Sequence, residues 1–417
     1  MTIKCEKIFD KAYRKLEELY SEKHHKPDIR IISRFYEEKK ILIGSELYIC
    51  FLDLVGRLKN VAAEKGECVT LWGTTGSSFI AYLLGATDVN PLPSHEYCPT
   101  CHKTNFRGEE NPFDRPAITC SCGADIVFDG YNIPFESNIE SALNEYIDVR
   151  VSYKFFKEAK QLILNENSGK RIITFENEDM NVNWFCFADD IECENKTCTF
   201  KDFSTNFSSY PHITLRCDKT LDKYRELENV TGVKWEETNN FSYSCVPLLI
   251  ESGTIYDIPH FNNDFCKEII RIIKPKSYGD LLKLIGLACS TNVWKNNTES
   301  LYYDHKLLFK EIPAFREELY DMICDKLRKK GIYETGFAYE VTEKTRKGFY
   351  FSNGGVDDDT LAVLLELGFD TDFISFIENV LYMFPKANAV NCFKNAMKLI
   401  FYKMSFSDEY NTIIKGI

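Results

Sequence analysis

Residues 68–101 read CVTLWGTTGSSFIAYLLGATDVNPLPSHEYCPTC, and this stretch decides the fold. Its β-branched start, Cys68–Leu71, predicts a strand, and its apolar segment, Phe79–Leu84, predicts a helix. A turn rich in glycine and serine joins the two. Glycines let a backbone approach a ligand closely, and the free N–H groups at a helix start favour an anion. The turn therefore predicts a phosphate-binding loop, with an ordinary tight turn as the alternative. Its candidate contacts are Gly73, Gly76, Ser77 and Ser78.

Length and composition indicate a folded protein with more than one subdomain. The chain has 417 residues, of which 44% are hydrophobic and 14% aromatic, enough for a large core in two or three subdomains. Its formal net charge of −12 argues against general coating of nucleic acid but leaves room for a local basic groove. The sequence has no apolar run near the roughly 18 residues that span a bilayer. No membrane partner is therefore expected.

The sixteen cysteines are expected to be reduced. The chain start lacks the apolar core of a signal peptide, so a cytoplasmic location is predicted, where thiols stay reduced. Two close pairs, Cys98 with Cys101 and Cys120 with Cys122, can place four thiolates around one zinc ion. Unligated buried thiols are the alternative, and His102 is a further candidate ligand. A zinc ion with four protein ligands has no open position, so it would stabilise the loop rather than catalyse a reaction.

The glycine–serine turn, the segment Val89–Pro93 and the cysteine pairs together resemble the palm of the bacterial DNA polymerase III alpha subunit of the PolC type. In that family the turn holds the triphosphate of the incoming nucleotide, and a zinc-binding insertion follows it. One departure is Trp72, which stands where the family has an arginine. The resemblance runs from about residue 5 to 405 and is strongest at 73–101, 130–136, 286–294 and 382–387.

The resemblance also locates the carboxylates with which that family holds two Mg²⁺ ions. Alternate side chains of a strand share a face, so two aspartates one residue apart converge on the metals. Here Tyr146 takes the first position, Asp148 the second and Thr214 the third, on a later strand. Arg150 shares the face of Asp148 and is expected either to pair with it or to form a surface pair without function. One carboxylate beside a cation is a poor Mg²⁺ site, so the metal centre looks dismantled.

Two acidic groups are candidate replacements for the lost carboxylates. Asp218 is close enough in sequence to Thr214 to be its shifted substitute. A patch formed by Asp189, Asp190 and Glu192 is either a solvated loop or a set of replacement ligands. Mg²⁺ is expected as a cofactor only if residual activity remains.

The second half of the chain resembles the fingers of the family. Tyr382–Ala387 matches closely, and by resemblance Lys386 lies near the phosphates of the nucleotide. Two polar groups are lost, because Cys289 and Asn388 stand where histidines are expected. The interval 326–347 is the most basic part of the chain and is either a phosphate-binding surface or a solvated helix face. Its candidate DNA contacts are Lys329, Lys330, Arg346 and Lys347.

The expected fold class is α+β, with a nucleotidyltransferase-like palm that has a mixed sheet and a zinc-ribbon insertion, plus a mostly helical thumb and fingers. The expected boundaries are residues 1–65 for the helical lead-in of thumb and palm, 66–260 for the palm with its insertion at about 94–128, and 261–417 for the helical fingers. The PHP, exonuclease, helix-hairpin-helix and clamp-binding regions of the family are not found in this sequence, which predicts a free-standing module.

Loss of the carboxylates favours a homologue that lacks polymerase activity and binds DNA, a deoxynucleotide or a replication protein, in the setting of a mobile element or a defence system. One alternative is an enzyme, namely a residually active DNA-directed DNA polymerase or nucleotidyltransferase that uses Asp148. Another alternative is a zinc-stabilised scaffold for protein interaction that binds no nucleotide. Primer extension that depends on Asp148 tests the enzyme, and DNA binding at low salt tests the scaffold.

Overall fold

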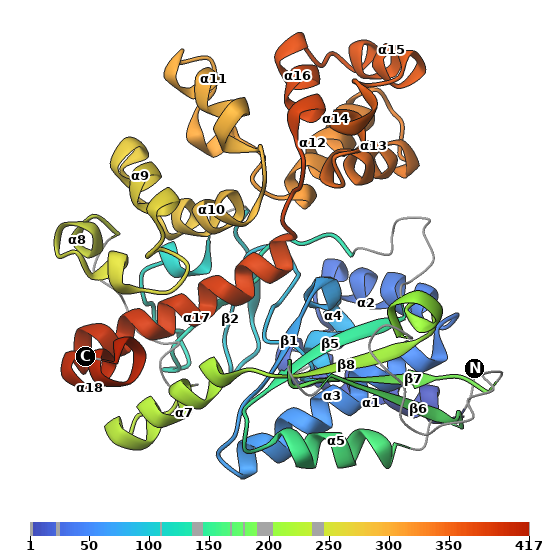
Figure 1. The fold of residues 1–417 in the computed structure, drawn as a ribbon, viewed down its shortest axis with the longest axis vertical. Coiled ribbons are helices and arrows are strands. Elements are labelled where there is room, and N and C mark those ends of the chain that lie inside the picture. The colour runs from blue at the N-terminus through green and yellow to red at the C-terminus, as the bar shows by residue number, and fades with distance from the viewer. Residues whose placement is uncertain are drawn as a thin grey trace. The chain divides into compact units, whose positions relative to one another are not determined.

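The computed structural model shows a chain divided into two compact units (Figure 1). One unit comprises residues 1–241 and 401–417, and the other comprises residues 242–400. Among the described helices, none combines the length and the apolar character needed to cross a bilayer. The structure describes residues 3–21, 26–108, 111–135, 145–166, 169–177, 180–189, 203–235 and 246–416.

The first unit is built on a five-stranded mixed sheet in the order β1-β5-β8-β7-β6. The inner pair β5 and β8 is parallel, whereas β1 is antiparallel to β5, and β7 is antiparallel to both β8 and β6. The strands are β1 (Val69–Trp72), β5 (Tyr146–Val151), β6 (Ile172–Asn177), β7 (Val182–Phe187) and β8 (His212–Cys217). The helices are α1 (Ile3–Tyr20), α2 (Ile29–Leu42), α3 (Glu46–Glu64), α4 (Phe79–Leu83), α5 (Phe156–Leu164), α7 (Lys219–Thr231) and α18 (Ser407–Tyr410).

The core of this unit lies between the sheet and the helices α3 and α5, which pack on one face of it (Figure 1). The alternation of β5 explains why, because its side chains at 147, 149 and 151 are apolar and fully buried while the intervening ones are polar. Helix α3 approaches the end of α4 so closely that a Cβ on Gly56 would lie 2.2 Å from the Leu84 carbonyl oxygen. Only glycine fits at this crossing.

A second, small sheet carries the cysteine pairs. It is antiparallel, in the order β3-β2-β4, and each strand has three residues. The strands are β2 (His95–Tyr97), β3 (Thr104–Phe106) and β4 (Val127–Asp129). Two short turns bearing the cysteines beside such a sheet are compatible with the predicted zinc-ribbon insertion.

The second unit is built from helices. Helix α17 begins in it, and the last residues of this helix belong to the first unit. The helices are α8 (Val246–Glu251), α9 (Asp264–Ile273), α10 (Tyr278–Cys289), α11 (Glu299–Tyr303), α12 (Arg316–Lys329), α13 (Gly336–Arg346), α14 (Phe349–Asn353), α15 (Asp358–Glu366), α16 (Thr371–Asn379) and α17 (Lys386–Ser405). The predicted α+β class with a mixed sheet is therefore confirmed. The division into thumb, palm and fingers stays a prediction.

Candidate functional site

Polar and aromatic side chains line the face of the five-stranded sheet that is turned away from the apolar core. On this face Asp148 of β5 lies between Trp72 of β1 and Thr214 of β8, its Cα partners in the two neighbouring strands. Thr214 is in turn paired with Trp184 of β7. The fold thus brings the second and third positions named by resemblance side by side. The first, Tyr146, lies two residues away on the same face of β5.

Asp148 forms an ion pair with an arginine of the neighbouring strand. Its Oδ2 accepts from Nε of Arg216 at 3.0 Å, across the parallel strands β5 and β8. Its Oδ1 is buried and has no partner among the described residues. Burial raises the pKa of Asp148 above its ordinary value, and the charges of Arg216 and Arg150 offset only part of this rise. One carboxylate oxygen of Asp148 is therefore bound by a guanidinium, and the other is buried in the protein.

Arg216 was not among the residues singled out from the sequence. Arg150 was expected to provide the pair to Asp148, but the hydrogen-bonded ion pair comes from Arg216. A signal for this role exists, because Arg216 follows Thr214 by two residues on one strand and so shares its face. What the sequence did not reveal was the parallel register that sets this face beside Asp148.

Arg150 contacts an aromatic ring and a different carboxylate. Its guanidinium lies over the Trp72 ring at 4.1 Å from the centroid, a cation–π geometry. Its Nη1 lies 3.5 Å from Oδ2 of Asp218. The Oδ1 of Asp218 accepts from the N–H of Thr220 at 2.9 Å and caps helix α7. Both oxygens of Asp218, the candidate shifted carboxylate, are thus engaged.

Aromatic rings occupy the rest of this face. Tyr146 stacks on His212 with centroids 5.4 Å apart and planes at 9°. Phe203 meets His212 edge-on at 5.0 Å and stacks on Trp184 at 5.1 Å. Burial lowers the pKa of His212, which keeps its imidazole neutral. Thr214, in the third carboxylate position, is buried.

These residues do not fit a two-metal centre. Mg²⁺ takes hard oxygen ligands in near-octahedral array at about 2.1 Å, and the only carboxylate of the three positions is paired with Arg216. Of the acidic patch, Asp189 is exposed and pairs with Lys170 at 2.6 Å. Asp190 and Glu192 lie outside the described residues. Across the described ranges, no group of three carboxylates gathers within ligand reach.

The glycine–serine turn leads into α4, and the first N–H groups of this helix donate to a buried carboxylate. Gly73 has φ of 99°, a left-handed conformation that favours glycine. Glu38 of α2 is fully buried, and its carboxylate accepts from the N–H groups of Phe79 and Ile80 at 2.8 and 3.0 Å. The hydroxyl of Ser78 donates to the same carboxylate at 2.9 Å. A negative charge of the protein itself thus lies at the start of this helix.

An arginine completes this arrangement. Arg34 pairs through Nε with Glu38 at 2.5 Å and donates through Nη2 to the Ser77 carbonyl at 2.6 Å. Helix starts attract anions, and here Glu38 already fills that position. A phosphate at the turn would have to share these donors with a carboxylate. The roles of Gly73, Gly76, Ser77 and Ser78 as nucleotide contacts stay predictions.

The four cysteines predicted as zinc ligands gather at one point. Their Sγ atoms all lie within 4.8 Å of one another. Cys98 and Cys122 are 3.4 Å apart, and Cys101 and Cys120 are 3.6 Å apart. Backbone N–H groups lower the pKa of the Cys98 thiol, to about 6, and that of Cys120, whereas contacts with neighbouring thiols raise the pKa values of Cys101 and Cys122, so two of the four favour the thiolate that a metal binds. The two turns that carry these cysteines therefore lie side by side.

This cluster fits a structural zinc ion. Zn–S bonds of about 2.3 Å in a tetrahedron separate the sulfurs by about 3.8 Å. This is close to the 3.4 Å between Cys98 and Cys122 and the 3.6 Å between Cys101 and Cys120. Four thiolates fill the coordination sphere, so the ion would stabilise the small sheet and supply no open position for chemistry. His102 is not part of the cluster. Its Nδ1 lies 3.3 Å from the carbonyl oxygen of Leu19 instead.

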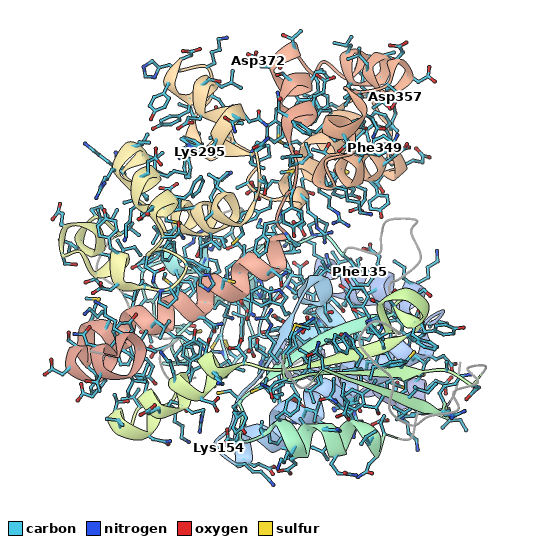
Figure 2. The ribbon with its side chains drawn as sticks, in the orientation of Figure 1. Phe135, Lys154, Lys295, Phe349, Asp357 and Asp372 are labelled. Carbon is cyan, nitrogen blue, oxygen red and sulfur yellow. The ribbon has the colours of Figure 1, made fainter. Side chains whose placement is uncertain are left out.

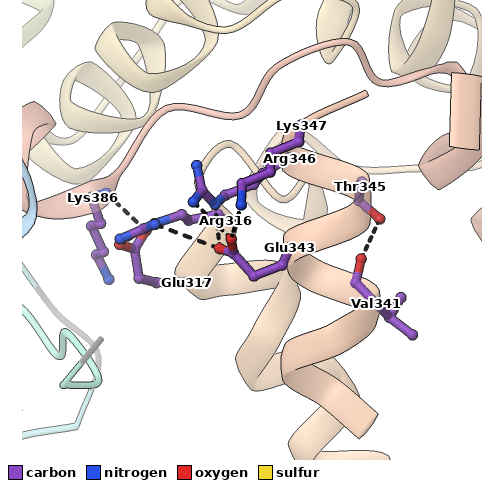
Figure 3. Close-up of polar contacts among 8 residues, drawn as sticks. All are labelled: Arg316, Glu317, Val341, Glu343, Thr345, Arg346, Lys347 and Lys386. Carbon is purple, nitrogen blue, oxygen red and sulfur yellow. Dashed lines mark hydrogen bonds and ion pairs between the residues drawn. The ribbon is translucent and has the colours of Figure 1, made fainter. Parts of the chain in front are cut away.

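Lys386 begins α17 in the second unit, beside side chains of alternating charge (Figure 3). Its backbone N–H donates to Glu317 Oε2 at 2.8 Å, and the other oxygen of Glu317 lies 3.1 Å from Nε of Arg316. Arg316 is buried, and its Nη1 lies 3.8 Å from Glu343. Cations and carboxylates of this cluster therefore largely neutralise one another, and the role of Lys386 toward phosphates stays a prediction.

The four predicted DNA contacts fall into two pairs. Arg346 and Lys347 both bind Glu343, Arg346 through two hydrogen bonds and Lys347 at 3.0 Å (Figure 3). Burial would raise the pKa of Glu343, but these cations lower it below its ordinary value, so the carboxylate stays ionised. Lys329 and Lys330 are exposed at the end of α12 and form no ion pair with any residue the structure describes. Their role as DNA contacts stays a prediction.

Another lysine of the basic interval is held by local contacts. Lys344 lies 2.7 Å from Glu340 and 3.7 Å from Asp357, and its ammonium is 5.7 Å from the centre of the Phe349 ring. Figure 2 labels Asp357 and Phe349. A paired lysine of this kind contributes less to phosphate binding than a free one. The unpaired positive charge of this interval is thus smaller than the sequence suggests.

We expect the stability of the protein to depend on pH through Asp321 of α12. Burial raises the pKa of this carboxyl to about 7, although Lys386 opposes the rise. Between about pH 4 and pH 7 the folded state keeps a proton that the unfolded chain releases, so the free energy of unfolding falls as the pH rises. Asp321→Asn should remove this pH dependence, which changes the free energy of unfolding by on the order of a few kcal/mol between pH 4 and pH 7. Denaturant unfolding across that range measures it.

A control for this experiment lies one turn further along the helix. Asp325 is exposed and pairs with Arg328 at 2.5 Å. Asp325→Asn should keep most of the slope of the parent protein, lowered only by loss of the like charge with which Asp325 helps to raise the pKa of Asp321. An unchanged slope in Asp321→Asn would contradict the assignment of the proton to this carboxyl.

Comparison with known proteins gives the chain a clear set of relatives. No family model matches it. It is 24% identical to the DNA polymerase III PolC-type of Halalkalibacterium halodurans, over 96% of this chain and 32% of that protein. It is 24% identical to the protein of the same name from Clostridium perfringens, over 98% of this chain, and 26% identical to that of Lacticaseibacillus paracasei, over 93%. The chain spans about a third of the length of the curated relatives it matches.

Proposed function

We propose that this homologue of PolC-type DNA polymerase III binds nucleic acid without extending a primer. The observation that carries the proposal is the ion pair between Asp148 and Arg216, in place of a cluster of carboxylates. Two-metal phosphoryl transfer needs several oxygens to hold two cations about 4 Å apart. Here Tyr146 and Thr214 occupy the other two positions and offer at most neutral hydroxyls.

The charge near the glycine–serine turn supports retained phosphate binding. The family has an arginine at the position of Trp72, and the guanidinium of Arg150 lies over the Trp72 ring. A cation is thus supplied to the same place from the neighbouring strand. Guanidinium groups bind phosphate oxygens through paired hydrogen bonds. This arrangement favours a nucleic-acid-binding module over a scaffold that binds no nucleotide.

Other parts of the proposal follow from the relatives. Their name assigns them to DNA polymerase III, so DNA or deoxynucleotide is the proposed partner and DNA replication the proposed process. The four-cysteine cluster would hold zinc as a structural ion. In this proposal Mg²⁺ has no catalytic part, and thumb, palm and fingers are the proposed names for the regions 1–65, 66–260 and 261–417.

Primer extension tests the proposal. We expect no added nucleotides on a primed template with either Mg²⁺ or Mn²⁺, because Asp148 is the only carboxylate among the three positions and it is paired. Asp148→Asn should behave as the parent protein does. Extension by the parent protein that disappears in Asp148→Asn would refute the proposal and establish residual polymerase activity.

Binding is measured on the same preparation. Filter binding of primed DNA across a salt series should give an affinity that falls as salt rises, as expected when phosphates are neutralised by protein cations. Absence of binding at low salt would favour the scaffold alternative instead.

A further inference from the structure

We propose that one half of the polar sheet face binds single-stranded nucleic acid without a divalent metal ion. This half, called the β5–β8 face, consists of Trp72, Tyr146, Asp148, Arg150, His212 and Arg216. The inference rests on the proposed function and deepens it, since it names the ligand and the way this sheet holds it. A base would stack on Tyr146, and phosphates would pair with Arg216 and Arg150.

The aromatic part of this site is a fixed platform. Tyr146 is 45% exposed, and one side of its ring is stacked on His212 at 5.4 Å. His212 is itself buried, with its Nδ1 2.7 Å from the Tyr210 carbonyl and its ring against Phe203. The ring of Tyr146 therefore loses little freedom when a base covers its open side. Exposed aromatic rings on a sheet are a common means of binding unpaired bases.

The cationic part lies on the same face. Arg150 and Arg216 are Cα partners in the parallel pair of strands, and their side chains are 28% and 37% exposed. A guanidinium carries five N–H donors. Asp148 takes Nε of Arg216, and Asp218 lies near a single Nη of Arg150. Donors therefore remain on both arginines for phosphate oxygens.

The geometry also decides the form of the ligand. Tyr146 and Arg150 are four residues apart on β5, or about 13 Å. One nucleic-acid strand can therefore place a base on Tyr146 and a phosphate further along its own backbone at Arg150. A base inside a duplex has no open face for Tyr146, so an unpaired strand is required. Because guanidinium groups meet the phosphates directly, the site needs no Mg²⁺ to neutralise them.

Fluorescence anisotropy with a short labelled single-stranded DNA of mixed sequence tests the inference. Binding should persist in EDTA and should not increase when Mg²⁺ is added. Tyr146→Ala should weaken it roughly five- to a hundred-fold, the range measured for loss of one stacked base, whereas Tyr146→Phe should keep it because the ring remains. Tyr153 offers a matched control, being 61% exposed and just beyond the end of β5. Tyr153→Ala should bind as the parent protein does.

The arginines are tested by a double substitution that leaves neither member of the ion pair charged without its partner. In the double variant Asp148→Asn and Arg216→Gln, both partners of the ion pair become neutral amides. The slope of log affinity against log salt should then fall by about 0.7 for the lost phosphate contact. Arg150→Gln should lower it by a similar amount.

The outcomes separate this inference from the proposed function. Binding that requires Mg²⁺, or that survives Tyr146→Ala and both arginine changes, overturns the inference but leaves a protein that binds nucleic acid at another place. Failure to bind either single-stranded or primed DNA at low salt overturns both. A preference for duplex over single strand also overturns the inference, because stacking on Tyr146 needs an unpaired base.

Discussion

Replacing Cys98 by serine is expected to abolish zinc binding and to loosen the small sheet around the cysteines. Each strand of this sheet has only three residues, too few to be stable without support. In zinc-finger peptides a structural zinc ion supplies about 10–16 kcal/mol of apparent binding free energy, which is also folding free energy. Metal analysis of the parent protein should give one zinc ion per chain, and that of Cys98→Ser close to none.

Loss of the metal should not affect the whole insertion equally. The ends of β2 and β4 next to the main core are tied to it by a buried polar network. In this network Asn90 donates to the Asp129 carboxylate at 2.8 Å and Tyr82 donates to it at 3.0 Å. The side chain of His95 lies 3.2 Å from the Tyr20 hydroxyl. Hydrogen exchange should therefore become fast in the cysteine turns and β3 but stay slow at His95 and Asp129.

A second cysteine controls for the loss of a thiol. Cys289 is half-buried in the second unit and lies outside the cluster, so Cys289→Ser should keep the full zinc content. Two results would contradict the assignment. One is a parent protein that contains no zinc although its thiols are reduced, and the other is a Cys98→Ser protein that keeps its zinc.

Local patterns in the sequence were enough to predict some of these features. The β-branched run before the glycine turn and the apolar run after it form β1 and α4. The four cysteines converge because close pairs on two short turns can meet with little rearrangement. Alternation along β5 places Asp148 and Arg150 on one face, as the period of a strand requires.

Contacts between segments that are distant in the sequence could not be predicted from local sequence patterns. The pair of Asp148 with Arg216 depends on the parallel register of β5 and β8, which no local pattern encodes. Glu38 likewise belongs to α2, and nothing in its own helix shows that its carboxylate will cover the start of α4. The sequence therefore identified Asp148 and Arg150 on this face but neither Arg216 nor Glu38, whose partners are set by contacts between distant segments.

Replacing Glu38 by alanine is expected to destabilise the first unit by about 3–5 kcal/mol, the usual cost of removing one partner of a buried ion pair. The change would leave the Arg34 guanidinium, whose side chain is only 14% exposed, without its carboxylate. It would also leave the N–H groups of Phe79 and Ile80 without their acceptor inside the core. Urea unfolding followed by circular dichroism measures the loss of free energy.

Two further variants separate the charge of Glu38 from its hydrogen bonds and from the general effect of losing a carboxylate. Glu38→Gln keeps one acceptor oxygen, so it should cost less than Glu38→Ala. Glu18 pairs with Lys15 on the surface of α1, and Glu18→Ala should change the free energy of unfolding by less than about 0.5 kcal/mol.

If the turn binds phosphate in this protein, Glu38→Gln should also raise its affinity for a nucleoside triphosphate, because the repelling charge is gone while the helix start keeps its donors. A Glu38→Ala protein as stable as the parent would mean that water reaches this carboxylate, and the interior anion would then no longer explain how the turn is held.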